Sequence, residues 1–365
     1  MILGQASGIE HLATGGTMDS IWSPEKDTAV PAQVSMAAEY FQFLARHGYP
    51  EIQSEVLMLK DSRDIEIEDK KLVARRVAES AVPRAIVTSG TYLMTDIGRR
   101  IQAHPTMRAN HFDKGVAMVA SLTPLEGFSM SDGGFGLGMA HAVLEDLDPK
   151  RSSAVVGVVN GVVAPIDVLE KDLTTATFES VDTSDSLLGY NRYTVIPAGG
   201  TIDFTFNGLD GVEPAETSFV PSYIRHRVRS SIEFDATPPI LKDSRNLTSE
   251  DMDMVVELVR QAPSEFVLVT AGILRIAELR ARLDQALANG DDHDRSRRVV
   301  LTGARYMLNS LTKSDAPYNL GYAHGKLGTI QPGAHIALAG RLIDDHEDPL
   351  SYVYTQRELE KVSIP

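Results

Sequence analysis

Short apolar runs alternate with amphipathic stretches along the chain. In the first half, the apolar runs predict strands at 9–13, 85–88, 115–121 and 154–159. The stretch 65–79 has apolar residues at helical spacing and charges on its other face, which predicts a helix. The run 85–88 is almost wholly apolar, as is typical of a parallel strand covered on both faces.

The second half repeats this alternation. Strands are predicted at 194–196, 266–269, 299–302 and 334–337, and a charged loop at 291–298. Strands that alternate with helices indicate right-handed βαβ units in a doubly wound sheet. The polar stretch 182–190 separates the halves, so we predict domains at 1–185 and 186–365, packed closely because no long linker joins them.

Three blocks of sequence occur twice, in the same order and at nearly constant offset. Residues 61–90 align with 243–272 without a gap, 131–141 align with 314–324, and 13–17 align with 197–201. Such self-similarity indicates one domain present in two copies. The predicted fold class is therefore α/β: two tandem copies of a flavodoxin/Rossmann-like, mostly parallel sheet sandwiched by helices and packed as a pseudo-dimer.

Composition excludes several function classes. The formal net charge of −15 disfavours binding to nucleic acid and to anionic membranes. The chain has no cysteine, which excludes disulfides, thiolate metal sites and a cysteine nucleophile. Its first ten residues do not resemble a signal peptide and no apolar run is long enough for a membrane helix, so we expect a cytoplasmic protein. We expect no metal site and no cofactor.

Three polar residues follow strands of the first copy, at the sheet edge where ligands bind in open α/β folds. Thr14 precedes two glycines, and its hydroxyl is a candidate nucleophile or a turn-stabilising group. Thr91 is either a second reactive hydroxyl or the N-cap of a helix that starts near Met94. Lys171 could accept a proton from a threonine if burial lowers its pKa, although most lysines in such loops are solvated.

Comparison of the two copies separates candidate chemistry from scaffold. The positions of Thr14 and Thr91 hold Ala198 and Ile273 in the second copy, and a less secure alignment pairs Lys171 with Leu350. The joint loss of three polar groups favours one working site and one retired site. The candidate carboxylate binders Ser62 and Arg63 recur in the second copy as Ser244 and Arg245, so part of their role is structural.

These motifs resemble those of the bacterial-type L-asparaginases, in particular the small single-domain asparaginase-like proteins. Residues 12–18 (Leu-Ala-Thr-Gly-Gly-Thr-Met) are similar to the first threonine motif of that family, and 87–94 (Val-Thr-Ser-Gly-Thr-Tyr-Leu-Met) to the second. Residues 122–138 resemble the block that ends Ser-Asp-Ala-x-Phe-Asn-Leu-Gly, and Asn160-Gly161 with Lys171 resembles the segment with the family lysine. The resemblance covers nearly the whole chain, once per copy.

The resemblance implies an amidohydrolase that acts on a small amide through a threonyl acyl intermediate. It makes Thr14 the nucleophile and Thr91 with Lys171 the proton-transfer pair. Ser62 would hold the substrate carboxylate, and the backbone at Gly90 would stabilise the oxyanion. The second copy would complete an intramolecular pseudo-dimer, and its Arg245 or Arg275 could reach the first cleft. Two chains could also form a homodimer.

The sequence departs from the family pattern around the second threonine. Tyr92 replaces an aspartate that in the family binds the amino group of the substrate, Ser89 replaces a histidine, and Arg63 replaces a common glutamine. These changes favour an amide other than asparagine. They also leave open a catalytically inactive relative that binds a small molecule or regulates. A nucleotide-binding Rossmann module is disfavoured because no Gly-x-Gly-x-x-Gly follows a strand.

Overall fold

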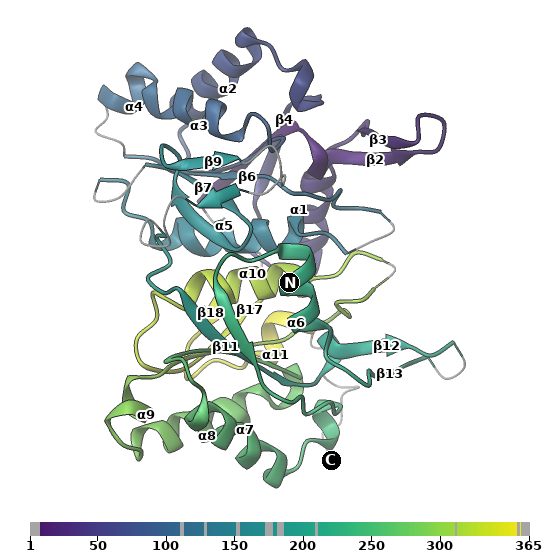
Figure 1. Ribbon diagram of the computed structural model, residues 1–365, viewed down its shortest axis with the longest axis vertical. Coiled ribbons are helices and arrows are strands. Elements are labelled where there is room, and N and C mark those ends of the chain that lie inside the picture. Colours follow the sequence, from purple (N-terminus) through teal and green to yellow (C-terminus); the bar gives the residue numbers. More distant parts are fainter. Residues whose placement is uncertain are drawn as a thin grey trace.

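Two six-stranded sheets with the same strand order form the architecture (Figure 1). The computed structural model describes residues 8–109, 113–127, 130–150, 154–171, 178–180, 186–208, 211–310, 312–355 and 358. The first sheet has the order β4 (Gln53–Lys60), β1 (Ile9–Gly15), β5 (Arg84–Thr88), β6 (Gly115–Val119), β7 (Val155–Val159) and β8 (Val162–Pro165). The second has the order β14 (Glu233–Ala236), β11 (Arg192–Ala198), β15 (Phe266–Ala271), β16 (Arg298–Thr302), β17 (Gly333–Leu338) and β18 (Arg341–Ile343).

Within each sheet the first five strands are parallel, and the last strand turns back antiparallel to its neighbour. The expected fold class of two mostly parallel α/β repeats is confirmed. Three two-stranded hairpins add to the sheets: β2 (Ser20–Ser23) with β3 (Thr28–Pro31), β9 (Leu169–Lys171) with β10 (Phe178–Ser180), and β12 (Phe204–Phe206) with β13 (Val212–Pro214). The first sheet ends at Pro165 and the second begins at Arg192, and the division at residue 185 stays a prediction.

Helices cover both faces of each sheet. Figure 1 shows one set at the two outer ends of the molecule: α2 (Ile67–Glu79), α3 (Met94–Ala103) and α4 (Pro105–Ala109) on the first sheet, with α7 (Ser249–Gln261), α8 (Ile276–Ala288) and α9 (Asp292–Ser296) on the second. The other helices are α1 (Met36–Arg46), α5 (Gly133–Asp146), α6 (Phe219–Tyr223), α10 (Ala316–Lys326) and α11 (Leu350–Val353). Short helical turns are η1 (Thr17–Asp19), η2 (Ser62–Asp64), η4 (Thr201–Asp203), η5 (Ile224–Val228), η6 (Ser244–Asn246) and η7 (Ile273–Arg275).

Two expected elements differ in detail. The helix expected at 65–79 begins at Ile67, because Glu66 and Asp69 form a reciprocal capping box there. The charged loop expected at 291–298 is wrong. Asp291 accepts a hydrogen bond from the backbone N–H of Asp294, which caps α9 in this segment, and β16 follows at once.

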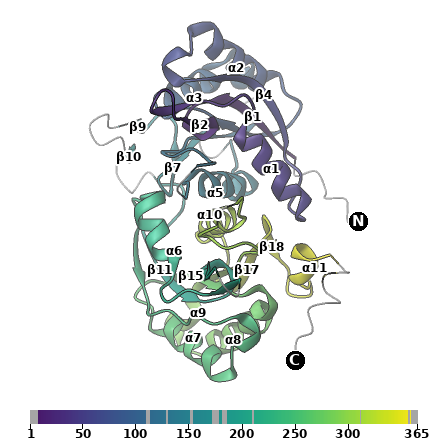
Figure 2. The ribbon, with the colours of Figure 1, turned by 90° about the vertical axis from the view of Figure 1, so that its right-hand side faces the viewer.

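The two halves pack through α5 and α10, which cross at the centre of the molecule (Figure 2). A Cβ on Gly138 would lie 2.0 Å from the carbonyl oxygen of Tyr318, and one on Gly321 would lie 2.0 Å from that of Phe135. The backbones therefore touch where both helices carry glycine, at matching positions of the two copies. This close approach is reciprocal, as in an isologous dimer interface.

Hydrogen bonds repeat the same reciprocity. The Tyr40 hydroxyl donates to the Ser314 carbonyl at 2.7 Å, and the Tyr223 hydroxyl donates to the Ser131 carbonyl at 2.7 Å. A further contact occurs on one side only: Glu145 on α5 accepts from the Tyr322 hydroxyl at 2.6 Å and pairs with Lys326 at 3.0 Å. The interface thus combines two-fold contacts with a charged cluster that breaks the symmetry.

Candidate active site

The turn after β1 packs directly against the turn after β5. Gly16 has φ +85°, and a Cβ at this position would lie 2.3 Å from the Cα of Gly90. Only glycine permits both this backbone conformation and this approach. The next residues of the two turns are Thr17 and Thr91, both at the carboxyl edge of the sheet, where open α/β folds bind ligands.

Thr14 does not point its hydroxyl into an open cleft, in contrast to the expectation. The residue lies within β1 and has no exposed surface. Its hydroxyl donates a hydrogen bond to the Thr88 carbonyl at 2.9 Å and so joins the ends of two neighbouring strands. This geometry is that of a group that stabilises the turn.

Thr17 is the threonine that the turn presents. It is partly exposed at the start of η1, and its hydroxyl has no hydrogen-bond partner within the described parts of the chain. The comparison of copies passed over this residue because Thr201 keeps it in the second copy. Its only signal in the sequence was its place directly after the Gly15–Gly16 pair, which does not report exposure.

Lys171 and Thr91 form a pair, as expected. Lys171 Nζ lies 2.6 Å from Thr91 Oγ1, although 80 residues separate the two in sequence. Thr91 does not cap the following helix, because α3 begins at Met94 after Leu93 and has no side-chain cap. The Thr91 hydroxyl oxygen instead accepts a hydrogen bond from the amine.

Burial lowers the pKa of Lys171, which increases the fraction of neutral amine at a given pH. None of the described carboxylates forms an ion pair with it. The ring of Tyr92 lies beside the amine, with its centroid 3.7 Å from Nζ, and 57% of Tyr92 is exposed. This ring contact favours the protonated amine and so opposes the effect of burial.

Ser62 lies behind the Gly90 turn, whereas the side chain of Arg63 is largely exposed. A Cβ on Gly90 would be 2.5 Å from the Cβ of Ser62, and the second copy repeats this contact between Gly272 and Ser244. The side chain of Arg63 is 79% exposed and forms an ion pair with Asp61 at 2.9 Å. Ser62 therefore borders the candidate site, and a role for Arg63 in substrate binding stays a prediction.

The backbone N–H groups of Gly90 and Thr91 face no acceptor among the described residues. Ser89, one residue earlier, donates to the Val119 carbonyl at 3.0 Å. Free backbone N–H groups beside a reactive hydroxyl are the usual components of an oxyanion hole.

The second copy keeps the turns and lacks the paired groups. Gly200 approaches Gly272 as Gly16 approaches Gly90, with 2.3 Å from an added Cβ to the Cα. Ala198 and Ile273 occupy the positions of Thr14 and Thr91. The alignment of Lys171 with Leu350 has no structural support, because the first lies in β9 and the second begins α11.

Two expected connections between the second copy and the first cleft differ from the structure. Arg245 pairs with Asp243 at 2.7 Å, and Arg275 pairs with Glu278 at 2.7 Å, so both guanidinium groups are bound within the second half. The Asn160–Gly161 turn of the first half contacts the second half. Asn160 Nδ2 donates to the Val228 carbonyl at 3.2 Å.

Comparison with known proteins identifies a family that part of the chain matches. A family model described as "Asparaginase, N-terminal" matches residues 9–185. No curated protein matches the chain. Similar solved structures include a probable cytoplasmic L-asparaginase from Campylobacter jejuni, with 15% identity over 72% of this chain and 82% of that one and a TM-score of 0.36. Another is the thermostable L-asparaginase from Thermococcus kodakarensis, with 15% identity over 89% and 88% and a TM-score of 0.37.

None of the helices within the described ranges has the length and apolar character needed to cross a membrane. The family match covers the first sheet, the hairpins β2–β3 and β9–β10, and every element that builds the candidate site. Residues 9–185 therefore belong to the asparaginase family, as its N-terminal domain.

Proposed function

We propose that the first half of the chain is an amidohydrolase that cleaves a small amide through a threonyl ester. The observation that carries this proposal is the 2.6 Å contact between Lys171 Nζ and Thr91 Oγ1, beside a turn that presents a second threonine. A partly buried amine next to a hydroxyl can accept its proton when the amine is neutral, and the hydroxyl in turn can accept one from a nucleophile or a water. The second half, without such a pair at Ala198 and Ile273, serves as a structural partner that arose by tandem duplication.

Thr17 is the proposed nucleophile, a role that the family resemblance implied for Thr14. Its hydroxyl is partly exposed and free of partners in the described structure, whereas the Thr14 hydroxyl is fully buried and already donates to Thr88. Thr17 Oγ attacks the amide carbonyl, its proton passes to Thr91 and Lys171, and ammonia leaves with a proton returned by the pair. A water then attacks the ester by the same route, which releases the acid and restores the Thr17 hydroxyl.

The remaining residues position the substrate. The N–H groups of Gly90 and Thr91 stabilise the oxyanion, a contribution of roughly 3–4 kcal/mol per preorganised donor. Ser62 holds a polar group of the substrate, such as a carboxylate. Tyr92 stands beside Lys171 with no paired carboxylate in the described structure, and this favours a substrate without a free ammonium group. Cytoplasmic location and a homodimer of chains stay predictions.

One observation favours a second candidate, a binding protein without turnover. The Tyr92 ring contacts Lys171 Nζ at 3.7 Å and stabilises the protonated amine, which cannot act as a base. In this case the site would bind its ligand and release no ammonia.

The test is ammonia release from a panel of asparagine, glutamine, N-acylated and cyclic amides. Thr17→Ala should lower turnover of the best substrate by at least about 10³-fold, because it removes the nucleophile. Thr14→Ala is the matched control. It introduces the residue that the second copy carries at Ala198, and we expect it to keep turnover within about tenfold, because it removes only a turn hydrogen bond.

Two results would contradict the proposal. Equal loss in the two variants, or loss only in Thr14→Ala, would reject Thr17 as nucleophile. Saturable binding of an amide with no ammonia release from the wild type would support the binding protein instead.

A further inference from the structure

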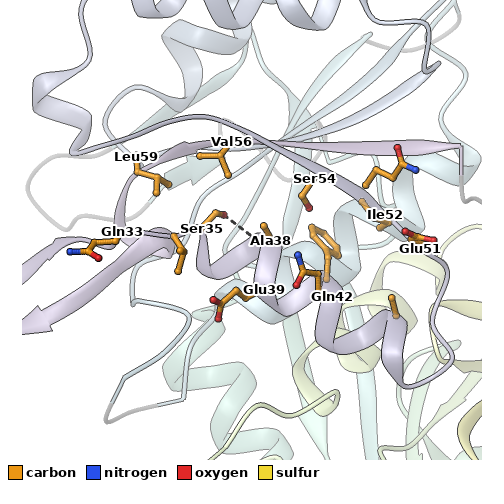
Figure 3. Close-up of a pocket in the computed structure, with 14 residues that line it drawn as sticks. Gln33, Ser35, Ala38, Glu39, Gln42, Glu51, Ile52, Ser54, Val56 and Leu59 are labelled. Carbon is orange, nitrogen blue, oxygen red and sulfur yellow. Dashed lines mark hydrogen bonds between the residues drawn. The ribbon is translucent and has the colours of Figure 1, made fainter.

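A pocket of about 730 Å³ lies between α1 and the edge strand β4, apart from the Thr17–Thr91–Lys171 site. Figure 3 shows Glu39 and Gln42 on the α1 wall and Ser54 and Val56 on the β4 wall. Its volume is in the range of small-molecule sites, about 300–1,000 Å³. No function described above uses it.

The lining selects a class of ligand. Glu39 and Glu51 supply carboxylates, of which Glu39 also pairs with Lys313 Nζ at 3.1 Å. Three glutamines, Ser35 and Ser54 supply neutral hydrogen-bonding groups, and none of the lining residues that the structure describes is Lys, Arg or His. Apolar surface accompanies them, and Val56 is 47% exposed. An organic amine with an aliphatic body matches both features.

The corresponding edge of the second sheet differs in charge. The pocket there, beside β14, has a volume of about 300 Å³ and is lined by Arg192 and Arg225 as well as by Glu233 and Asp235. A cationic ligand would therefore bind the pocket beside β4 in preference to the pocket beside β14.

A hydrogen-bonded path leads from the pocket under the candidate active site. Ser54 Oγ lies 3.0 Å from His11 Nδ1, and His11 Nε2 lies 3.0 Å from Thr88 Oγ1. Thr88 ends β5, directly before the turn that carries Thr91. The second copy lacks the path: Val195 stands at the position of His11, and the Thr270 hydroxyl, which corresponds to Thr88, has no hydrogen-bond partner among the described residues.

Burial lowers the pKa of His11 to about 3, so the ring is neutral near pH 7 and carries one N–H proton. Both neighbours are hydroxyls, which can donate or accept, and so either tautomer satisfies the path. A ligand ammonium that donates to Ser54 Oγ leaves the Ser54 hydroxyl to donate to Nδ1. The ring proton then resides on Nε2 and is donated to Thr88.

We propose that the α1–β4 pocket binds a small aliphatic amine and that binding fixes the tautomer of His11. The hydrogen bond from His11 to Thr88, directly before the turn that carries Thr91, then depends on whether the pocket is occupied. The effect on catalysis rests on the proposed function. The binding site and the response of His11 do not, and they are measured without turnover.

The first experiment is calorimetric titration of the full chain with 1,5-diaminopentane, with 1,5-pentanediol as the neutral probe of similar length. We expect saturable binding of the diamine and at least about tenfold weaker binding of the diol, which corresponds to about 1.4 kcal/mol. Val56→Arg should abolish diamine binding, because it fills the pocket and adds a positive charge. Val212→Arg is the matched control, since Val212 is 51% exposed on β13 of the second half.

The second experiment follows the imidazole nitrogens by NMR of ¹⁵N-histidine-labelled protein. His11→Val, which copies Val195 of the second half, identifies the His11 signals. The diamine should move the Nε2 resonance toward the protonated-nitrogen range in the wild type and should leave it unchanged in Val56→Arg.

Three results would overturn the proposal. Absence of saturable diamine binding, or equal binding to Val56→Arg, rejects the site. Binding with unchanged His11 nitrogens rejects the path. Concentration-dependent self-association of the wild type that Val56→Arg abolishes would make this edge an interface between copies. A protein that binds the diamine and releases no ammonia would refute the proposed function and leave this site intact.

Discussion

Replacement of Gly138 by alanine tests the contact that joins the two halves. The added Cβ would lie 2.0 Å from the Tyr318 carbonyl oxygen, 2.8 Å from its carbon and 3.0 Å from the Cα. Ordinary contact begins at 3.4 Å, and backbone atoms cannot rotate away. The helices α5 and α10 must therefore separate, and the apolar contacts around them loosen.

The expected change in the free energy of unfolding results from two opposing effects. Overpacking of a dense interior costs roughly 1–3 kcal/mol, and more when rigid backbone is struck. Alanine in place of glycine stabilises a helix by about 1 kcal/mol, because its helix propensity is higher. We expect the free energy of unfolding to fall by about 2 kcal/mol, since the Cβ added on α5 overlaps rigid backbone of α10. The reciprocal Gly321→Ala, which meets the Phe135 carbonyl at 2.0 Å, should cost a similar amount.

The assay is reversible urea unfolding followed by circular dichroism, with Gly136→Ala as control. Gly136 lies in the same helix, and its added Cβ meets only the Val119 Cγ1 at 3.1 Å. This control receives the same gain in helix propensity, so its stability should stay within about 1 kcal/mol of wild type. If Gly138→Ala were as stable as Gly136→Ala, α5 and α10 would not be in backbone contact and the packing described above would be refuted.

Three further predictions concern the site and the interface. Lys171→Met should reduce ammonia release by about 10²–10⁴-fold with unchanged unfolding, because it removes the base beside Thr91, and equal turnover would refute that role. Burial alone would raise the pKa of Glu145, but His141, Lys326 and Tyr322 lower it to about 2. Glu145→Gln should therefore cost about 1–2 kcal/mol at pH 7, and the difference should disappear as pH falls from about 4.5 to 2, as measured by urea unfolding at each pH. Tyr40→Phe should cost about 1–3 kcal/mol in the same assay, because it leaves the buried Ser314 carbonyl without a donor, and no loss would reject that bond.

The sequence predicted the strands of the sheet centres well. The run 85–88 lies in β5, where four of five residues are buried, and complete burial leaves an apolar sequence. The edge strand β4 was not predicted. Four of its eight residues are exposed, and charged or polar side chains at a free edge hide the strand pattern. The helix α9 was missed because its charges resemble those of a loop, whereas its cap depends on local geometry at Asp291.

The candidate site was predicted in part. Thr91 and Lys171 were identified because both stand at strand ends and Thr91 has no counterpart in the second copy, and the structure brings them to 2.6 Å. The comparison between copies detects differences only. It therefore selected Thr14, whose hydroxyl is internal, and passed over Thr17, which both copies share. Exposure depends on how the turn folds, and no pattern in a single sequence reports it.

The asymmetric cluster of Glu145, Tyr322 and Lys326 between α5 and α10 has a consequence for how such a chain evolves. In an assembly of two identical subunits, each substitution appears twice, once on either side of the axis. Here one helix has acquired an acid and the other a base, which requires that the partners vary separately. The presence of both halves in one chain permits this difference. It also relieves one half of the need to keep reactive groups, provided that it continues to supply the helix against which the other half folds.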